Sequence, residues 1–275
     1  MNNTKPQIHN SDLERMAMCG ILWQRTKGYK FGCAEKKEIA LPSPALAIGS
    51  AVHASVQVNL LNKIDNKELV PRESIPDTAR DSFQGIWDGG MLLSEDEATD
   101  QQGTLGGSID MSIALSLLHY DELAPELNPV AVEKKWVLEM PEEFPFDLAG
   151  QIDIVERSGI RDTKTRKASP PKGTARSLQM GMYSLAHKKH TGKLPEKVSI
   201  DCLVKTKTPK VVVDTAIPTM DWIDPVFRRI EQAWRTIEAV KAGYDCFQPA
   251  DPTHWICSKR YCPFAITCKF WSGKE

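Results

Sequence analysis

The spacing of apolar residues divides the chain into helical segments, with an apolar residue every three or four positions, and strand segments, where apolar and polar residues alternate. Helices are predicted around residues 12–25, 51–63, 105–120, 175–190 and 222–243. Strands are predicted around residues 131–140, 147–157, 159–167, 197–207 and 209–217. Helices therefore come first, then strands, then a helix, a hairpin and a last helix. This order predicts an α/β domain around a mixed sheet, with helical additions on the N-terminal side.

Local signals set the expected boundaries of these elements. Ser50 is placed as the N-cap of the helix that follows Gly49, and the proline-containing stretch at 41–49 is expected to form a loop. Ser158 and Gly159 predict a turn between two strands, and Thr208 and Pro209 predict a hairpin turn. Residues 62–100 are acidic and weakly periodic, so the pattern assigns them no element.

The overall charge balance conceals two oppositely charged segments. The chain of 275 residues carries a formal net charge of −1, with 41% hydrophobic and 26% charged residues, as in an ordinary globular protein. Residues 62–126 hold 14 Asp and Glu against 4 Lys and Arg, whereas residues 161–210 hold 13 Lys and Arg against 3 Asp and Glu. Either the basic segment binds a polyanion, or both segments are solvated surfaces.

The cysteine content bears on the cellular compartment. No apolar run approaches the roughly 20 residues that span a bilayer, and the polar N-terminal stretch lacks the apolar core of a secretory signal. A cytoplasmic location is therefore expected. Seven cysteines, an odd number in a reducing compartment, favour a metal site plus bystanders over a disulfide framework.

Candidate catalytic chemistry is concentrated on two neighbouring predicted strands. Asp153 lies on one of them, and Asp162 and Lys164 lie two residues apart on the next, so the side chains of Asp162 and Lys164 share a face. Carboxylate oxygens are the ligands that Mg²⁺ prefers, and a lysine beside them can orient a water or stabilise charge on a phosphate. This combination is suited to phosphodiester hydrolysis, although a D-x-K triplet by itself is common in unrelated chains.

The surrounding motifs make the pattern more specific. Gly150 and Asp153 form G-x-x-D, Gln179 and Tyr183 form Q-x-x-x-Y on one helix face, and His53 lies in an upstream helix. In this order the motifs resemble those of the RecB-like branch of the PD-(D/E)XK nucleases. This group includes the RecB and AddB nuclease domains, CRISPR-associated spacer-acquisition nucleases and phage exonucleases. The resemblance extends over nearly the whole chain, and a phage origin is among the readings that it allows.

The resemblance implies a site and a fold. His53, Asp153 and Asp162 would bind Mg²⁺ or Mn²⁺, with the backbone carbonyl of Thr163 as a further ligand. Lys164 would be the catalytic lysine. The implied fold is a restriction-endonuclease-like core in a single domain over residues 1–275. Within it we expect an acidic helical insertion at about 62–126, a catalytic sheet core at 127–220, and a tail at 244–275 that joins the vicinity of Cys19.

The same resemblance assigns supporting residues. Gln179 and Tyr183 would contact DNA or hold the active-site geometry. The chain departs from the family pattern at Asp162, because the triplet commonly begins with glutamate. Aspartate has a shorter side chain but carries the same charge. The basic residues Arg166, Lys167, Lys172 and Arg176 follow the catalytic lysine, and Lys205, Lys207 and Lys210 surround the predicted hairpin tip. Such positions suit phosphate contacts that do not read sequence.

The cysteines indicate a second metal site. Cys257, Cys262 and Cys268 lie close together, and Cys19, at the other end of the chain, could complete a four-sulfur site for zinc or an iron-sulfur cluster. The family resemblance favours an iron-sulfur cluster, of the 4Fe-4S type. The wide Cys257–Cys262 spacing and the absence of a proline after Cys19 leave zinc, or a lost cluster, open.

The remaining cysteines are secondary candidates. Cys33 competes with Cys19 as the N-terminal member, but its lysine-rich, glycine-flanked setting predicts a loop. Cys202 and Cys246 are read as buried or incidental thiols.

The motifs together favour a metal-dependent, sequence-independent DNA exonuclease in recombination, repair or DNA processing. A recombinase or helicase partner is expected, because no helicase motif is present. Two alternatives stay open: a non-catalytic nucleic-acid-binding module that retains the scaffold, and a zinc-stabilised regulatory protein without nuclease activity.

Overall fold

The computed structural model describes residues 5–168, 173–271 and 273, and it divides the chain into two compact units. The first unit contains residues 1–41, 136–150 and 223–275, and the second contains residues 42–135 and 151–222. Strands β2 (Pro129–Leu138) and β3 (Asp147–Glu156) and helix α8 (Met220–Lys241) begin in one unit and end in the other. Each unit contains one of the two sites expected from the sequence, so each is described by itself.

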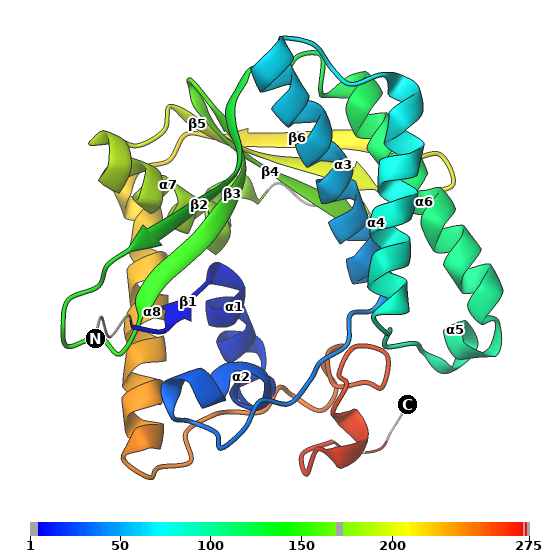
Figure 1. Cartoon of the computed structure of the whole chain (residues 1–275). Coiled ribbons are helices and arrows are strands. Elements are labelled where there is room, and N and C mark those ends of the chain that lie inside the picture. Colours follow the sequence, from blue (N-terminus) through cyan, green and yellow to red (C-terminus); the bar gives the residue numbers. More distant parts are fainter. Residues whose placement is uncertain (1–4, 169–172, 272, 274–275) are drawn as a thin grey trace. The chain divides into compact units, whose positions relative to one another are not determined.

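The second unit contains most of a mixed sheet and the helices that flank it (Figure 1). Its helices are α3 (Pro44–Asn66), α4 (Ile75–Asp88), α5 (Glu95–Thr99), α6 (Gln101–Glu122) and α7 (Leu178–Thr191), with 3₁₀ turns at Arg72–Ser74 and Thr174–Arg176. Its strands are β2 (Pro129–Leu138), β3 (Asp147–Glu156), β4 (Gly159–Arg166), β5 (Lys197–Val204) and β6 (Lys210–Ala216). Helices α3, α4 and α6 pack side by side.

With the short strand β1 (Gln7–Ile8), the sheet has the strand order β1-β3-β4-β5-β6, and β2 also pairs with β3. Strand β4 runs antiparallel to β3 and parallel to β5, and β6 forms the expected antiparallel hairpin with β5. The connection from β4 to the parallel strand β5 passes through α7, as parallel pairing requires a crossover. The predicted fold class, a mixed sheet flanked by helices, is confirmed.

Helix α3 begins earlier than the sequence pattern predicted. It starts at Pro44 with Ser43 as its N-cap, so Ser50 lies inside the helix and the stretch at 44–49 is helical, not a loop. Pro44 occupies the first helical position, where a missing backbone N–H costs nothing, and the residues after it are good helix formers. Residues 62–100, which the pattern left unassigned, contain the end of α3 and helices α4 and α5.

The core of the second unit lies between helices α3, α4 and α6 and the sheet. Its buried members are Ala47, Ile48, Ala51, Val52, Val56, Leu60, Phe83, Leu115, Leu123, Ala124, Leu127, Ile154 and Leu203. Helix α3 is long and apolar enough, by length and composition alone, to cross a bilayer. Half of its most apolar window is buried inside the fold.

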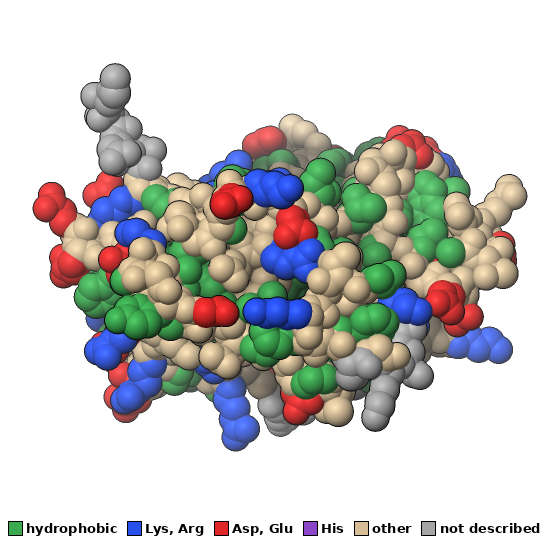
Figure 2. All heavy atoms as spheres, turned by 90° about the horizontal axis from the view of Figure 1, so that it is seen from below, with side chains coloured by type: hydrophobic (Ala, Val, Ile, Leu, Met, Phe, Trp, Pro, Cys, Tyr) green, Lys and Arg blue, Asp and Glu red, His purple; other side chains and the backbone are tan. Residues whose placement is uncertain are grey.

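The first unit has shorter elements and an aromatic core. It contains β1 (Gln7–Ile8), α1 (Asn10–Met18), α2 (Gly20–Lys27), a 3₁₀ turn at Gly28–Phe31, most of α8 (Met220–Lys241) and a 3₁₀ turn at Ala265–Thr267. Trp23 packs against Phe31 and Phe247 with ring centroids 5.2 and 5.4 Å apart. The face of the molecule in Figure 2 shows positive and negative side chains interspersed with small apolar patches.

The N-terminal helical segment is interrupted at Cys19, which the pattern had placed inside one helix. Cys19 has an extended backbone, with φ −155° and ψ 94°, and it separates α1 from α2. Its backbone N–H donates to the Arg15 carbonyl, and the N–H of Gly20 donates to the Gln248 carbonyl in the C-terminal segment. The break therefore fixes the cysteine between two short helices.

Candidate functional site

The register of strands β3 and β4 places the two predicted aspartates together. Ile154 lies opposite Arg161 in this antiparallel pair, so the next step of the ladder sets Asp153 opposite Asp162. The Thr163 N–H donates to Asp153 Oδ2 over 2.8 Å. Asp153 and Asp162 are both buried, whereas Lys164 is partly exposed. The strand ladder thus holds both carboxylates on regular backbone next to a lysine.

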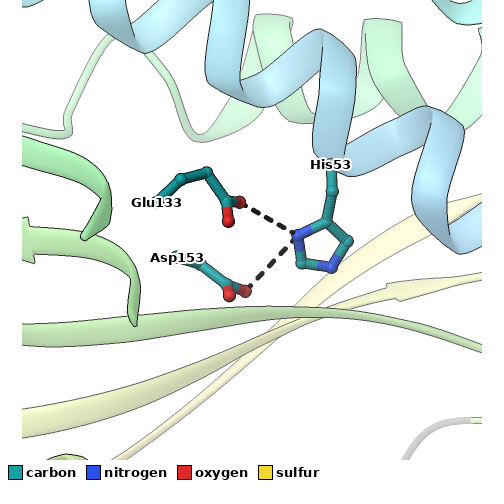
Figure 3. Close-up of side chains that lie close together, drawn as sticks. All are labelled: His53, Glu133 and Asp153. Atoms are coloured by element: carbon teal, nitrogen blue, oxygen red, sulfur yellow. Dashed lines mark ion pairs between the residues drawn. The ribbon is translucent and has the colours of Figure 1, made fainter. Parts of the chain in front are cut away.

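From helix α3, His53 reaches Asp153 and a third carboxylate, that of Glu133 (Figure 3). Its Nδ1 lies 3.5 Å from Asp153 Oδ2 and 3.7 Å from Glu133 Oε1. One ligand atom from each of His53, Glu133 and Asp153 lies within 4.8 Å of the others, and we call these three residues the metal-binding group. Gly49, one turn before His53, brings α3 close to β4: a Cβ there would lie 3.4 Å from Thr165 Oγ1.

Glu133 is the member of this group that sequence reasoning missed. It lies on β2, and Gln151 on β3 donates a hydrogen bond to its carboxylate. Its backbone φ of +51° is one that non-glycine residues rarely adopt. Such conformations often occur at functional sites, where the surrounding structure holds them. The sequence signal was weak, because Glu139 stands in the same predicted strand and nothing local distinguishes the two.

A second set of contacts holds Asp162. Lys164 Nζ lies 3.0 and 2.9 Å from its two oxygens, and Gln179 Nε2 donates to Oδ1 over 2.8 Å. Gln179 also donates to the Tyr183 hydroxyl over 2.7 Å. The Q-x-x-x-Y motif on α7 is therefore brought to the D-x-K triplet on β4. Asp162 is not one of the three residues of the metal-binding group, although its charge acts on Asp153 and His53.

The electrostatics of this site favour a cation. Burial, and then the nearby Asp162 carboxylate, raise the pKa of Asp153 to about 7 against the opposing effects of His53 and Lys164. Burial lowers the pKa of His53, but Glu133, Asp153 and Asp162 outweigh it, so the net shift is upward. Burial, and then Asp162, also raise the pKa of Tyr183. Several carboxylates thus share a poorly solvated space that holds too little positive charge to neutralise them.

The residues present fit a divalent metal ion. Two carboxylates and an imidazole converge with oxygen and nitrogen donors, and Mg²⁺ and Mn²⁺ both accept carboxylate-rich sites with remaining water ligands. The elevated pKa of Asp153 is the expected signature of a buried carboxylate whose counter-ion is the metal. Thr163, whose carbonyl was predicted as a further ligand, is fully buried on β4 between Asp162 and Lys164.

The G-x-x-D motif also has a packing role. A Cβ at Gly150 would lie 2.5 Å from the indole ring of Trp136, so the ring of the neighbouring strand occupies the space that a side chain would need. Any larger residue at position 150 would push β2 and β3 apart. Glu133 precedes Trp136 on β2 and Asp153 follows Gly150 on β3. The glycine therefore helps to set the distance between the two strands that carry these carboxylates.

The predicted DNA-contacting cations are exposed around the end of β4. Arg166, Lys167 and Arg176 are all exposed, and Lys207 and Lys210 are exposed near the β5–β6 hairpin. Lys205 is partly buried; burial lowers its pKa, and nearby Lys167 lowers it further. Lys172 lies outside the described residues.

The first unit brings together the four predicted cysteines. Cys19, Cys257, Cys262 and Cys268 line one apolar pocket, and we call them the cysteine site. Burial raises the pKa of the Cys257 thiol, and the other three thiols of the site raise it further, which reflects their mutual proximity. Four converging thiols suit either zinc or an iron-sulfur cluster.

Arg25 on α2 places a positive charge beside the cysteine site. Arg25 lies with its guanidinium carbon 4.0 Å from the centre of the Phe264 ring, and it donates to Glu38 and to Thr267 Oγ1. Its charge lowers the pKa of Cys262, against the larger effect of burial. A cation beside a group of thiolates partly neutralises them.

The other cysteines lie outside this pocket. Cys33 is buried, and burial raises the pKa of its thiol to about 11, so it is a poor ligand candidate. Cys202 is fully buried on β5, and Cys246 lines a different pocket of the first unit, near Phe247. None of these three lines the pocket that the four site cysteines share.

The comparisons with known proteins identify the class. The sequence pattern of the PD-(D/E)XK nuclease superfamily matches residues 10–269, so the chain belongs to this superfamily. A protein of Eubacterium rectale, provisionally named an exonuclease, has a crystal structure that matches at TM-score 0.57 and 14% identity, over 92% of this chain and 87% of the other. That likeness supports the fold alone.

Two further comparisons add nothing to the argument. The structure of SSO0001 covers 94% of both chains, but at 12% identity and TM-score 0.34. A search of the curated proteins found no match.

Proposed function

We propose that the chain is a metal-dependent, sequence-independent DNA exonuclease of the RecB-like branch. One observation carries the proposal: His53, Glu133 and Asp153 come from a helix and two strands to within 4.8 Å of one another, next to the Asp162–Lys164 pair. Membership of a nuclease superfamily makes phosphodiester hydrolysis the expected reaction at such a site. The exonuclease designation of the Eubacterium rectale protein is a further, weaker reason.

Each residue of the site then has a distinct role. His53, Glu133, Asp153 and Asp162 would bind the divalent ion, which would stabilise negative charge on the scissile phosphate. Lys164, 2.9 Å from Asp162, would orient the attacking water or place its positive charge near the phosphate.

The helix behind the site would keep this arrangement in place. Gln179 holds Asp162 through one hydrogen bond and Tyr183 through another, so α7 fixes the carboxylate's orientation. Residues that orient metal ligands in this way affect activity almost as strongly as the ligands.

The exposed cations around the site would bind the substrate backbone. Arg166, Lys167 and Arg176 would contact phosphates, which position a strand without reading its sequence. Activity that falls steeply with salt concentration, and depends little on sequence, would support this role.

The proposed activity is tested by digestion of end-labelled linear DNA. Anaerobically purified protein is incubated with single- or double-stranded DNA and Mg²⁺ or Mn²⁺, beside Lys164→Ala and the matched surface variant Lys167→Ala. We expect Lys164→Ala to lower the rate by about a thousandfold, because removal of one general acid–base or charge-stabilising group typically costs this much. Lys167→Ala should act mainly on the salt-dependent KM.

The alternative function is a non-catalytic nucleic-acid-binding module. If wild-type protein with full metal content and an intact fold leaves both DNA and RNA undigested, the catalytic proposal is wrong and this alternative replaces it. Cleavage confined to RNA would contradict the DNA assignment while leaving the hydrolytic site in place. A labelled circular DNA that is also cut would contradict exonuclease action.

We also propose that the cysteine site holds an iron-sulfur cluster of the 4Fe-4S type. The support is the convergence of Cys19 with the three C-terminal cysteines in one apolar pocket. Iron and sulfide in about a 1:1 ratio, with visible absorbance lost on oxidation, would agree with this assignment. A colourless protein with stoichiometric zinc would contradict it and would make the site a structural zinc site. A recombinase or helicase partner is proposed from the family resemblance only.

A further inference from the structure

Exposed aromatic and basic side chains gather beside the cysteine site. His254, Trp255, Arg260 and Tyr261 form what we call the aromatic–basic patch. Trp255 exposes 56% of its surface and Tyr261 exposes 37%. The Trp255 ring centre lies 5.0 Å from that of Tyr261, at 90°, and 5.4 Å from that of His254. The guanidinium carbon of Arg260 lies 5.7 Å from the Tyr261 ring centre.

This grouping differs from the other exposed apolar side chains. Among the described residues, the exposed large apolar side chains include four aromatic ones: Phe227, Tyr244, Trp255 and Tyr261. Within these four, the ring contact is between Trp255 and Tyr261. Large rings left in water at one place usually mark a binding surface. Rings accompanied by a guanidinium are suited to stacking on nucleobases, since every base offers a flat π-face.

The charge of the surrounding segment points to a polyanion. Residues 251–271 contain three basic residues, Lys259, Arg260 and Lys269, and one acidic residue, Asp251. A basic surface with interleaved aromatic rings is the combination that binds single-stranded nucleic acid without sequence preference. A purely apolar partner would not account for the cations.

The cysteines hold the backbone on which these rings stand. Trp255 comes two residues before Cys257, and Tyr261 immediately precedes Cys262. The N–H of Cys257 donates to the His254 carbonyl over 2.8 Å, and the N–H of Cys262 donates to the Ser258 carbonyl over 2.9 Å. A metal bound by Cys257 and Cys262 would therefore fix the loop between them and the aromatic–basic patch with it.

We propose that the aromatic–basic patch binds the bases of a single DNA strand by stacking on Trp255 and Tyr261, with Arg260 beside the strand's phosphates. This inference rests on the proposed nuclease function, and it assigns the selection of unpaired DNA to the aromatic–basic patch. Duplex DNA offers the patch few open base faces, because its bases are stacked on one another. The patch therefore favours single strands over duplexes.

Binding of labelled oligothymidylate, without cleavage, tests the proposal. All variants are made in the full-length Lys164→Ala protein, purified anaerobically and assayed in EDTA. We expect Trp255→Ala to weaken single-strand binding about tenfold, as removal of one stacking ring does. Trp255→Phe, which keeps a ring, should stay within about threefold of the parent. Affinity for duplex DNA should change less than about twofold. Phe227→Ala, an exposed ring on α8, is the matched control.

Tryptophan fluorescence gives a second readout that does not depend on a disruptive variant. Oligothymidylate should quench part of the fluorescence of the parent, which has seven tryptophans. Trp255→Phe should lose that quenching while it keeps its affinity. Equal quenching in the parent and Trp255→Phe would overturn the proposal, as would equal single-strand affinity in Trp255→Ala and Phe227→Ala.

Failure of this inference can be told apart from failure of the nuclease proposal. If Mg²⁺-dependent cleavage is abolished by Lys164→Ala while the Trp255 variants bind single strands normally, the nuclease stands and the stacking patch is wrong. In that case the exposed rings fit a protein partner instead. If the wild type neither cleaves nor binds DNA, both proposals are overturned.

Discussion

The two units build their sites on different kinds of backbone. In the second unit, the metal-binding group stands on α3, β2 and β3, and Asp162 and Lys164 stand on β4. In the first unit, Cys257 lies in a bend, Cys262 lies in an irregular segment and Cys268 follows a single 3₁₀ turn. The catalytic side chains are thus placed by hydrogen-bonded ladders and a long helix, whereas the C-terminal thiols are placed by segments with little regular structure.

The apolar cores around the two sites also differ in size. The cluster that packs α3 against the sheet has thirteen buried apolar residues, whereas the cluster beside the cysteines has four: Leu22, Ala250, Ile256 and Phe264. Small cores contribute little stability and are usually supplemented by metals or disulfides. The comparison teaches that the fold supports the catalytic site, while a metal or cluster bound at the cysteine site would support the fold around it.

The largest effect that this comparison predicts is on the cysteine site. Cys262→Ser should lower the melting temperature by roughly 10 °C, because ligand loss removes several kcal/mol of metal-coupled folding energy. It should also increase proteolysis within residues 244–275. Cys246→Ser is the matched control, because Cys246 lines a different pocket. Calorimetry and limited proteolysis measure both. Equal melting temperatures in the two variants would mean that the cysteine site does not stabilise the first unit.

The second prediction concerns Glu133. Loss of a ligand at the cysteine site should lower stability, whereas loss of a ligand in the metal-binding group should weaken metal binding without lowering stability. Glu133→Gln removes a charge but keeps the shape, so it should raise the Mg²⁺ concentration for half-maximal cleavage roughly 10- to 100-fold. The melting temperature without metal should not fall, because one of several crowded carboxylates is neutralised. Glu139→Gln, an exposed residue of the same chain segment, is the control. A variant with unchanged metal dependence would show that Glu133 is not a ligand.

Much of the fold could be predicted from the pattern of apolar residues. Strands β2 to β6, most of the long helix α6 and the β5–β6 hairpin were expected, because period-two and period-3.6 patterns report on burial directly; the two-residue strand β1 was not. The start of α3 was not, since two prolines and several small residues at 41–49 resemble a loop as well as a helix beginning with proline. The break at Cys19 was also missed, since the periodicity of residues 12–25 continues across it.

The candidate site was predictable where several residues share a motif. Asp162 and Lys164 are two residues apart, and Gln179 and Tyr183 four apart, so each pair fixes its own geometry. Glu133 could not be found in this way, because its place in the site depends on an unusual backbone φ and on the pairing of β2 with β3. Such features arise from tertiary structure and leave no local spacing in the sequence.

The third prediction compares two glycines with different surroundings. Gly150→Ala should lower the free energy of unfolding by about 1–3 kcal/mol, because its Cβ would overlap the Trp136 ring. Gly106→Ala, in the middle of α6 with open space around it, should instead stabilise by up to about 1 kcal/mol. Denaturant titration gives both values. A neutral Gly150→Ala would mean that the strands move apart at little cost.

The smallest expected effect concerns the pH dependence of stability that comes from the buried residue His119. His119, on α6, is buried, and burial, together with the nearby charges of Arg161 and His53, lowers its pKa to about 3. In the unfolded chain a histidine titrates near 6.5. The unfolded state therefore binds a proton below pH 6.5 that the folded state does not bind until about pH 3, so this group makes stability fall as pH falls within that window.

His119→Leu removes this contribution, so the variant should depend less on pH than the wild type. Between pH 6 and pH 5, the wild type should lose about 1 kcal/mol more unfolding free energy than His119→Leu, because one proton is taken up only on unfolding. Replacing the exposed His190 by leucine is the matched control and should preserve the wild-type slope. Denaturant titrations at both pH values measure the difference. Parallel curves for wild type and His119→Leu would mean that water or a proton reaches the His119 side chain in the folded state. That side chain would then be less shielded from solvent than its burial indicates.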